Sequence, residues 1–232
     1  MYTLHINGFL DSEVPIIINS LQIAQRKLFL GGLSKASPPL WVSLESEGGD
    51  VMAAIETGRL LKTGWHSPTN TRVNPGHSCI SACVFLLAAG KNRESAGTIG
   101  IHRPRFTEIN AESLDANSLK RSYENLYLLI NDYLNYNNIH PDFLDDMWTV
   151  PSNKIVILSR SQLERYRLLG KDLIYAEMEN LELIKSCGEN APQLRDDFWE
   201  QHRKECSEHE GLECLHGLVK SHPYGDCLSK TK

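Results

Sequence analysis

Two spacings of apolar residues alternate along the chain as far as residue 175, and they predict strands and helices in turn. Short apolar segments bounded by glycine, proline or polar residues predict strands, here at residues 2–10, 40–44, 69–74, 98–102 and 155–158. Apolar residues at positions i, i+3, i+4 and i+7 predict helices, here at residues 14–30, 51–61, 80–87, 112–137 and 162–169. Strands that alternate with helices in this way predict an α/β fold.

The composition of the chain changes near residue 176, where charged and helix-forming residues become more frequent. The segment beyond this point also contains four of the six cysteines. We therefore predict an α/β domain at residues 1–176 and a helical, cysteine-rich extension at residues 177–232. A chain of 232 residues is long enough for one sizeable hydrophobic core, or for one domain with an appendage.

Charge and motifs argue against several classes of function. The formal net charge is −5 and the basic residues are scattered, so no electrostatic feature favours nucleic acid or an anionic membrane. The sequence contains no phosphate-binding loop of the G-x-x-x-x-G-K-[ST] type. The apolar run at residues 84–89 is far shorter than the roughly 20 residues that span a bilayer. We expect no nucleic-acid partner, no membrane span and no cofactor.

Ser81 lies in the segment GHSCISACVFLLAAG, at the point where a predicted turn passes into an apolar helix. A serine hydroxyl becomes a nucleophile only with a base in reach and with hydrogen-bond donors for the oxyanion that forms. The N–H groups of a helix N-terminus point toward such a position, so the N–H of Ala82 is a candidate donor. Gly48 and Gly49 end another strand, and a glycine turn can bring a second N–H close. The alternative role of Ser81 is a helix cap.

His102 is the strongest candidate for the base among nine histidines. It ends a predicted strand in which Ile99 and Ile101 face one side, so the histidine faces the other side. Pro104 then breaks the strand, and functional residues are common on such loops. The alternative is an ordinary surface histidine.

Cys79 and Cys83 flank Ser81, and a disulfide between them would link the turn to the first turn of the helix. A dithiol switch and, for Cys83, a buried thiol are the alternatives. An even number of cysteines with a clustered tail favours disulfides, and the tail allows three pairings. A zinc site with the tail histidines, or free buried thiols, are the alternatives there. The tail cysteines are Cys187, Cys206, Cys214 and Cys227.

Three motifs occur in the order SEGGDVMAAIETGRLLK, CISACVFLLAAG and IGIHRP. This order resembles the Clp-protease proteolytic subunit and its relatives in the Clp/crotonase superfamily, which include exported bacterial proteins with cysteines around the serine. The resemblance covers roughly residues 1–175. It implies a spiral of β-β-α units, with Ser81 as nucleophile, His102 as base, and backbone oxyanion donors at Gly49 and Ala82. It also implies a homo-oligomer that acts on peptides or unfolded proteins.

The third member of the catalytic site is where the sequence departs from this family. The family's acid lies shortly before a Leu-Ser or Leu-Thr pair, and the corresponding segment here is PSNKIVILSRSQLERYRLLG. Alignment on its Leu-Ser pair puts Ile155 at the position of the acid. Asn153 is the nearest residue whose side chain can accept a hydrogen bond from imidazole, so we predict it as the third member. Asp145 and Asp146, on a preceding helix, are the alternatives.

These observations favour an ATP-independent serine peptidase that uses Ser81, His102 and Asn153. The alternative is a catalytically weak or inactive Clp-like protein that binds peptides or mediates assembly; acyl-CoA chemistry on the same fold is less favoured. The N-terminal segment MYTLHINGFL has neither a basic start nor a long apolar core, so it is not a signal peptide. The cysteines favour a periplasmic or secreted protein whose leader is absent from this chain, and a cytoplasmic protein is the alternative.

Overall fold

A computed structural model describes residues 2–30, 40–63, 65, 69–106 and 115–207 of the chain. The chain forms two compact units, Met1–Asp172 and Leu173–Lys232. Their boundary lies close to residue 176, where we divided the sequence. Within the described ranges, no helix is long and apolar enough to cross a bilayer.

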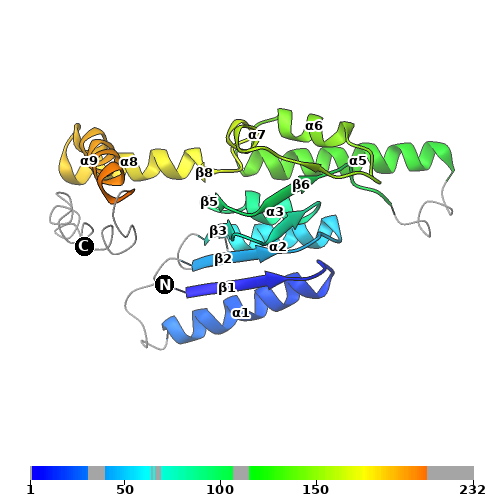
Figure 1. The fold of residues 1–232 in the computed structure, drawn as a ribbon. Coiled ribbons are helices and arrows are strands. Elements are labelled where there is room, and N and C mark those ends of the chain that lie inside the picture. Colours follow the sequence, from blue (N-terminus) through cyan, green and yellow to red (C-terminus); the bar gives the residue numbers. More distant parts are fainter. Residues whose placement is uncertain (1, 31–39, 64, 66–68, 107–114, 208–232) are drawn as a thin grey trace. The chain divides into compact units, whose positions relative to one another are not determined.

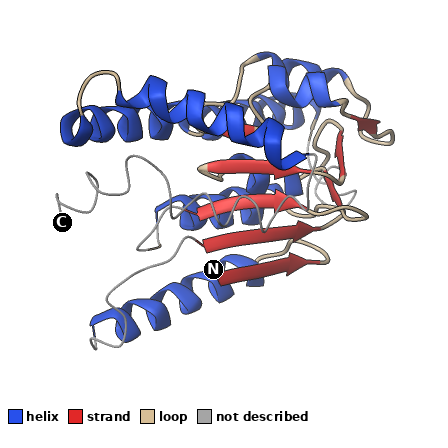
Figure 2. Cartoon of the chain, turned by 60° about the vertical axis from the view of Figure 1, so that its left-hand side comes forward, coloured by secondary structure: helices blue, strands red, loops and turns tan. Residues whose placement is uncertain are grey.

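The first unit contains a five-stranded sheet among its described residues, with the strand order β1-β2-β3-β5-β8 (Figure 1). The first four strands are parallel and β8 is antiparallel to β5, so the prediction of an α/β fold is confirmed. Figure 2 shows these strands in red, side by side. The bounds of the strands are Tyr2–Asn7 for β1, Leu40–Glu45 for β2, Thr69–Val73 for β3, Asn92–Ser95 for β5 and Gly170–Lys171 for β8.

Helices connect the parallel strands, as a parallel sheet requires. Helix α1 (Glu13–Leu30) joins β1 to β2, and α2 (Val51–Thr63) joins β2 to β3. Helix α3 (Cys83–Ala88) precedes β5. All side chains of α3 are at most 1% exposed, because a helix that is apolar on every side is stable only when it is surrounded by the core.

A smaller sheet of three strands has the order β4-β6-β7 and carries the candidate site. Strand β4 (Ser78–Ile80) runs parallel to β6 (Thr98–Ile101), and β7 (Val156–Ile157) runs antiparallel to β6. The other helices among the described residues of the first unit are α5 (Ala116–Tyr136), α6 (Asp142–Thr149) and α7 (Arg160–Arg165).

The second unit contains α8 (Leu173–Cys187) and α9 (Ala191–Ser207).

Three strands of the described residues, β4, β5 and β8, lie outside the predicted strand segments. The apolar spacing predicts a helix from Ile80, but residues 78–80 form β4, and α3 begins only at Cys83. Pairing explains this, because β4 bonds to β6 on one side, and on the other Cys79 bridges to Ser46. Strand β5 has the polar sequence NRES, which contains no strand signal, and it owes its place to pairing with β3.

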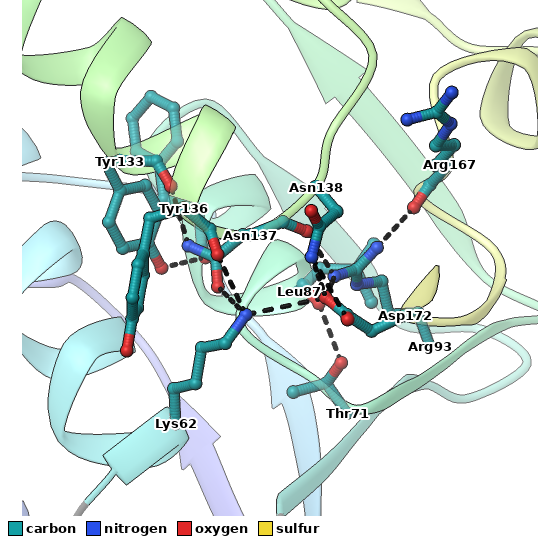
Figure 3. A network of polar contacts seen from close by, with 11 residues as sticks. Lys62, Thr71, Leu87, Arg93, Tyr133, Tyr136, Asn137, Asn138, Arg167 and Asp172 are labelled. Carbon is teal, nitrogen blue, oxygen red and sulfur yellow. Dashed lines mark hydrogen bonds and ion pairs between the residues drawn. The ribbon is translucent and has the colours of Figure 1, made fainter. Parts of the chain in front are cut away.

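A buried polar network joins β5 to the end of α5 (Figure 3). The guanidinium of Arg93 is 1% exposed, and it donates to Asp172 Oδ2 at 3.1 Å and to the Asn137 carbonyl at 2.6 Å. Lys62 of α2 donates to Asn137 Oδ1 at 3.1 Å and lies 3.4 Å from Asp172. Burial lowers the pKa of Lys62 and of Arg93, and the Asp172 carboxylate opposes this shift. The carboxylate therefore compensates the charge of two buried cations.

We predict that Asp172→Asn destabilises the first unit by about 3–5 kcal/mol, because it removes the carboxylate that compensates buried charge. Urea unfolding followed by circular dichroism measures the change. Glu164→Gln is the matched control, since it neutralises an exposed acid whose partner Arg160 lies 2.9 Å away. That surface pair should contribute at most about 1 kcal/mol. Equal losses for the two variants would contradict the prediction.

Candidate active site

Ser81 occupies a tight turn between β4 and α3. Its φ angle is 55°, in the left-handed region that residues other than glycine rarely adopt. The Ser81 N–H donates to the Gly100 carbonyl at 2.9 Å, which continues the β4–β6 pairing. The Ser81 carbonyl accepts from the Val84 N–H at 3.1 Å, where α3 begins. The side chain is partly exposed, as expected for a serine on a strained turn from strand to helix.

A disulfide joins Cys79 to Cys83 and spans the turn that holds Ser81. The predicted bond is therefore confirmed, and both cysteines are fully buried. The two residues do not share a helical face, because Cys79 belongs to β4 and Cys83 is the first residue of α3. The bond ties the strand to the helix directly across Ser81.

The other predicted cysteine pairings fall only partly within the described residues. Cys187 is disulfide-bonded, and no cysteine with a described side chain is free. The side chain of Cys206, and all of Cys214 and Cys227, lie outside the described residues. Within the described part, no group of three or more side chains could hold a metal ion.

Gly48 and Gly49 approach the Ser81 turn and Leu10, respectively, so closely that no side chain would fit. A Cβ atom on Gly48 would lie 2.8 Å from both the Ile80 carbonyl oxygen and Ser81 Cβ. A Cβ atom on Gly49 would lie 2.1 Å from the Leu10 carbonyl oxygen. The φ angles of +99° and +148° also favour glycine at both positions.

The N–H of Gly49 points to the side of the segment on which Ser81 lies. The Gly48 carbonyl accepts from the Leu10 N–H at 2.9 Å. In a planar trans peptide the following N–H, that of Gly49, points the opposite way. Ser46 bridges to Cys79 on that opposite side. Neither the Gly49 N–H nor the Ala82 N–H is used in the turn, loop and cap hydrogen bonds between described residues.

His102 is the first residue after β6, the strand that pairs with β4 before Ser81. The β4–β6 register pairs Ile80 with Gly100, so Ser81 lies beside Ile101 and His102 is one residue further on. Adjacent strands are about 4.8 Å apart, so the backbones of Ser81 and His102 follow neighbouring strands, one register position from each other. None of the hydrogen bonds between described residues joins the Ser81 hydroxyl to the His102 ring. The ring instead bonds through Nδ1 to the carbonyl oxygen of Arg103, at 2.9 Å.

Asn153 is exposed in a turn that the Lys154 N–H closes on the Pro151 carbonyl at 2.9 Å. No hydrogen bond between described residues links Asn153 to His102. The β6–β7 register pairs Ile101 with Val156, and its continuation places Ile155 beside His102. The alignment with the Clp family had also put Ile155 at the position of the acid.

The alternative acids, Asp145 and Asp146, bind other partners. Asp145 accepts from Tyr127 at 2.9 Å, and Asp146 accepts from Arg165 and Tyr166.

An open groove of about 690 Å³ lies at the carboxyl ends of β1 and β2 and reaches the start of β4. Ligands of parallel sheets commonly bind at this end of the strands. The Ser78 hydroxyl donates to Glu47 within the groove, at 2.7 Å. The lining residues are Asn7, Gly8, Phe9, Glu45, Ser46, Glu47 and Ser78.

No protein-family model and no curated protein matches the chain. The resemblance to the Clp/crotonase superfamily therefore depends on the three sequence motifs.

We predict that the double variant Cys79→Ala/Cys83→Ala is less stable than the wild type by about 2 kcal/mol, the value expected for closing a very short loop. Urea unfolding without reductant measures the difference. Peptide mapping of the denatured, unreduced wild type provides the control, and it should recover residues 79 and 83 in one linked peptide. Alkylation of either thiol under those conditions would contradict the disulfide.

Proposed function

We propose that the first unit is an ATP-independent serine peptidase of the Clp/crotonase type, with Ser81 as nucleophile and His102 as base. The observation that carries the proposal is the β4–β6 pairing, which brings the left-handed turn of Ser81 beside the end of β6, directly before His102. The missing bond between the two side chains is compatible with this role, because catalytic hydrogen bonds are often long until substrate binds.

The chemistry follows from the groups around the turn. Ser81 Oγ attacks the substrate carbonyl while His102 accepts the hydroxyl proton and then passes it to the leaving amine. Water later hydrolyses the acyl-enzyme with the same histidine as base. The N–H groups of Gly49 and Ala82 stabilise the oxyanion, and both lack an acceptor among the turn, loop and cap bonds of the described residues.

The proposed substrates are peptides and unfolded proteins. An extended peptide can bond through its main chain to a sheet edge, and its side chains can enter an adjacent groove. The groove at the start of β4 suits this arrangement, since its lining residue Ser78 lies three positions before Ser81. The sequence has no ATP-binding loop of the type described above, so the substrate would arrive already unfolded.

Assembly and compartment are also part of the proposal. Leu128 and Tyr136 of α5 are 57% and 52% exposed, and a homo-oligomer formed through this helix would cover them. The Cys79–Cys83 disulfide favours an oxidising compartment, such as the periplasm or the cell exterior.

One observation favours the second candidate, a peptide-binding or assembly protein without activity. The position beside His102 that would hold the acid carries the apolar side chain of Ile155. Without a carboxylate, the imidazolium that forms during catalysis is less stabilised. A retained fold with weak or lost chemistry would have this residue pattern.

A fluorophosphonate probe distinguishes the two candidates, because it labels only an activated serine. We predict that the wild type is labelled at neutral pH and that Ser81→Ala is not. His102→Gln should slow labelling by about 10²-fold or more, the usual contribution of a general base.

Ser20→Ala is the matched control, since Ser20 is an exposed serine of α1 whose hydroxyl bonds to the Ile16 carbonyl, outside the candidate site and the groove, and its loss should not affect labelling. Absence of labelling in a wild type that circular dichroism shows to be folded would favour the binding protein.

A further inference from the structure

The hydrogen bond between His102 and Arg103 determines which ring nitrogen carries the proton. Nδ1 lies 2.9 Å from the main-chain carbonyl oxygen of Arg103. A carbonyl oxygen can only accept, so Nδ1 must be the donor. In a neutral imidazole Nε2 then has a free lone pair, which is the form that a general base requires.

The Arg103 carbonyl is held in place from both sides. The Arg103 N–H donates to the Val150 carbonyl at 2.9 Å. Pro104 follows and is buried, and a residue that precedes proline is restricted to extended backbone. The orientation of this carbonyl is therefore set by the fold and does not depend on the exposed side chain of Arg103.

The side chains considered for this role do not compete for Nδ1. Asn153 makes no bond to His102 among the described residues, and the residue that the β6–β7 register places beside His102 is Ile155, just before β7. Asp145 and Asp146 accept hydrogen bonds from Tyr127 and Tyr166, respectively.

We infer that the main-chain carbonyl of Arg103 takes the place of the third catalytic side chain and positions His102 as the base. The inference deepens the proposed function and rests on it. In the first step the Ser81 Oγ–carbon bond forms and the hydroxyl proton moves to Nε2, while the Nδ1 proton stays on the ring and remains bonded to Arg103. As the scissile carbon–nitrogen bond breaks, the Nε2 proton moves to the leaving amine.

A carbonyl dipole stabilises the imidazolium less than a full negative charge does, so the site should be slow but improvable. Ile155 is the place to add charge, because it lies beside His102 and is 52% exposed. Because Ile155 is not a core residue, replacing it with the smaller aspartate would leave no cavity in the core.

The first test does not depend on activity. Nitrogen-15 NMR of histidine-labelled protein, with the His102 signals assigned by comparison with His102→Gln, reports the tautomer of the neutral ring. We expect the proton on Nδ1. A neutral His102 with its proton on Nε2 would overturn the inference, whether or not the protein is a peptidase.

The second test compares rates of fluorophosphonate labelling. Ile155→Asp should raise the rate by about tenfold or more, since it supplies a charged partner for the imidazolium. In a plot of labelling rate against pH, the fall in rate on the acidic side should occur at higher pH in Ile155→Asp than in the wild type. The reason is that the added carboxylate favours the protonated His102 ring, which cannot act as a base. Ile155→Asn is the control of equal size without charge, and it should leave the rate nearly unchanged.

Two further variants separate main chain from side chain. Asn153→Ala and Arg103→Ala should both be labelled at the wild-type rate, because neither changes the carbonyl. A large loss in Asn153→Ala, or no difference between Ile155→Asp and Ile155→Asn, would overturn the inference. If neither the wild type nor Ile155→Asp is labelled, the proposed function fails. The NMR measurement of the His102 tautomer then still tests whether the Arg103 carbonyl orients the ring.

Discussion

The left-handed conformation of Ser81 is the constraint on which the candidate site depends. Such a conformation costs on the order of 1–3 kcal/mol in a residue with a side chain, so the surrounding structure must impose it. Three features do so here: the bond from the Ser81 N–H to Gly100, the disulfide that spans the turn, and the close approach of Gly48. The result is a serine side chain that stands at the surface although the helix behind it is completely buried.

The core behind the turn provides rigidity. Helix α3 is surrounded by the sheet and by α2 and α5, and Tyr133 of α5 donates to the Phe85 carbonyl at 2.7 Å. Gly58 of α2 leaves the room that this ring needs, since a Cβ there would lie 1.9 Å from the Tyr133 hydroxyl. Burial raises the pKa of Tyr133, which keeps its hydroxyl a donor. The Tyr133 hydroxyl and the Thr71 hydroxyl, which donates to the Leu87 carbonyl at 2.8 Å, fix α3 in the core, and the Ser81 turn leads directly into this helix.

The backbone of the candidate site is well ordered, but the histidine has no charged partner among the described residues. The backbone offers two N–H groups and an ordered turn, but the histidine is oriented by a dipole where a charge would stabilise it more. This combination explains why a slow peptidase and a non-catalytic binding protein are both consistent with the same turn. The difference between them is the stabilisation of one imidazolium.

The sequence alone determined the alternation of strands and helices, because apolar spacing is a local signal. It favoured a disulfide between Cys79 and Cys83 because of their short separation, and the structure decided between that bond and the alternatives. It also singled out Ser81 and His102, through motifs around each residue. It did not indicate β5, whose polar residues are held by a neighbouring strand and by the buried network. It assigned Ile80 to a helix and predicted no strand at residues 78–80, because apolar spacing contains no information on strand partners. Only the tertiary structure decided what lies beside His102, since register depends on contacts between distant segments and a main-chain carbonyl has no signature in the sequence.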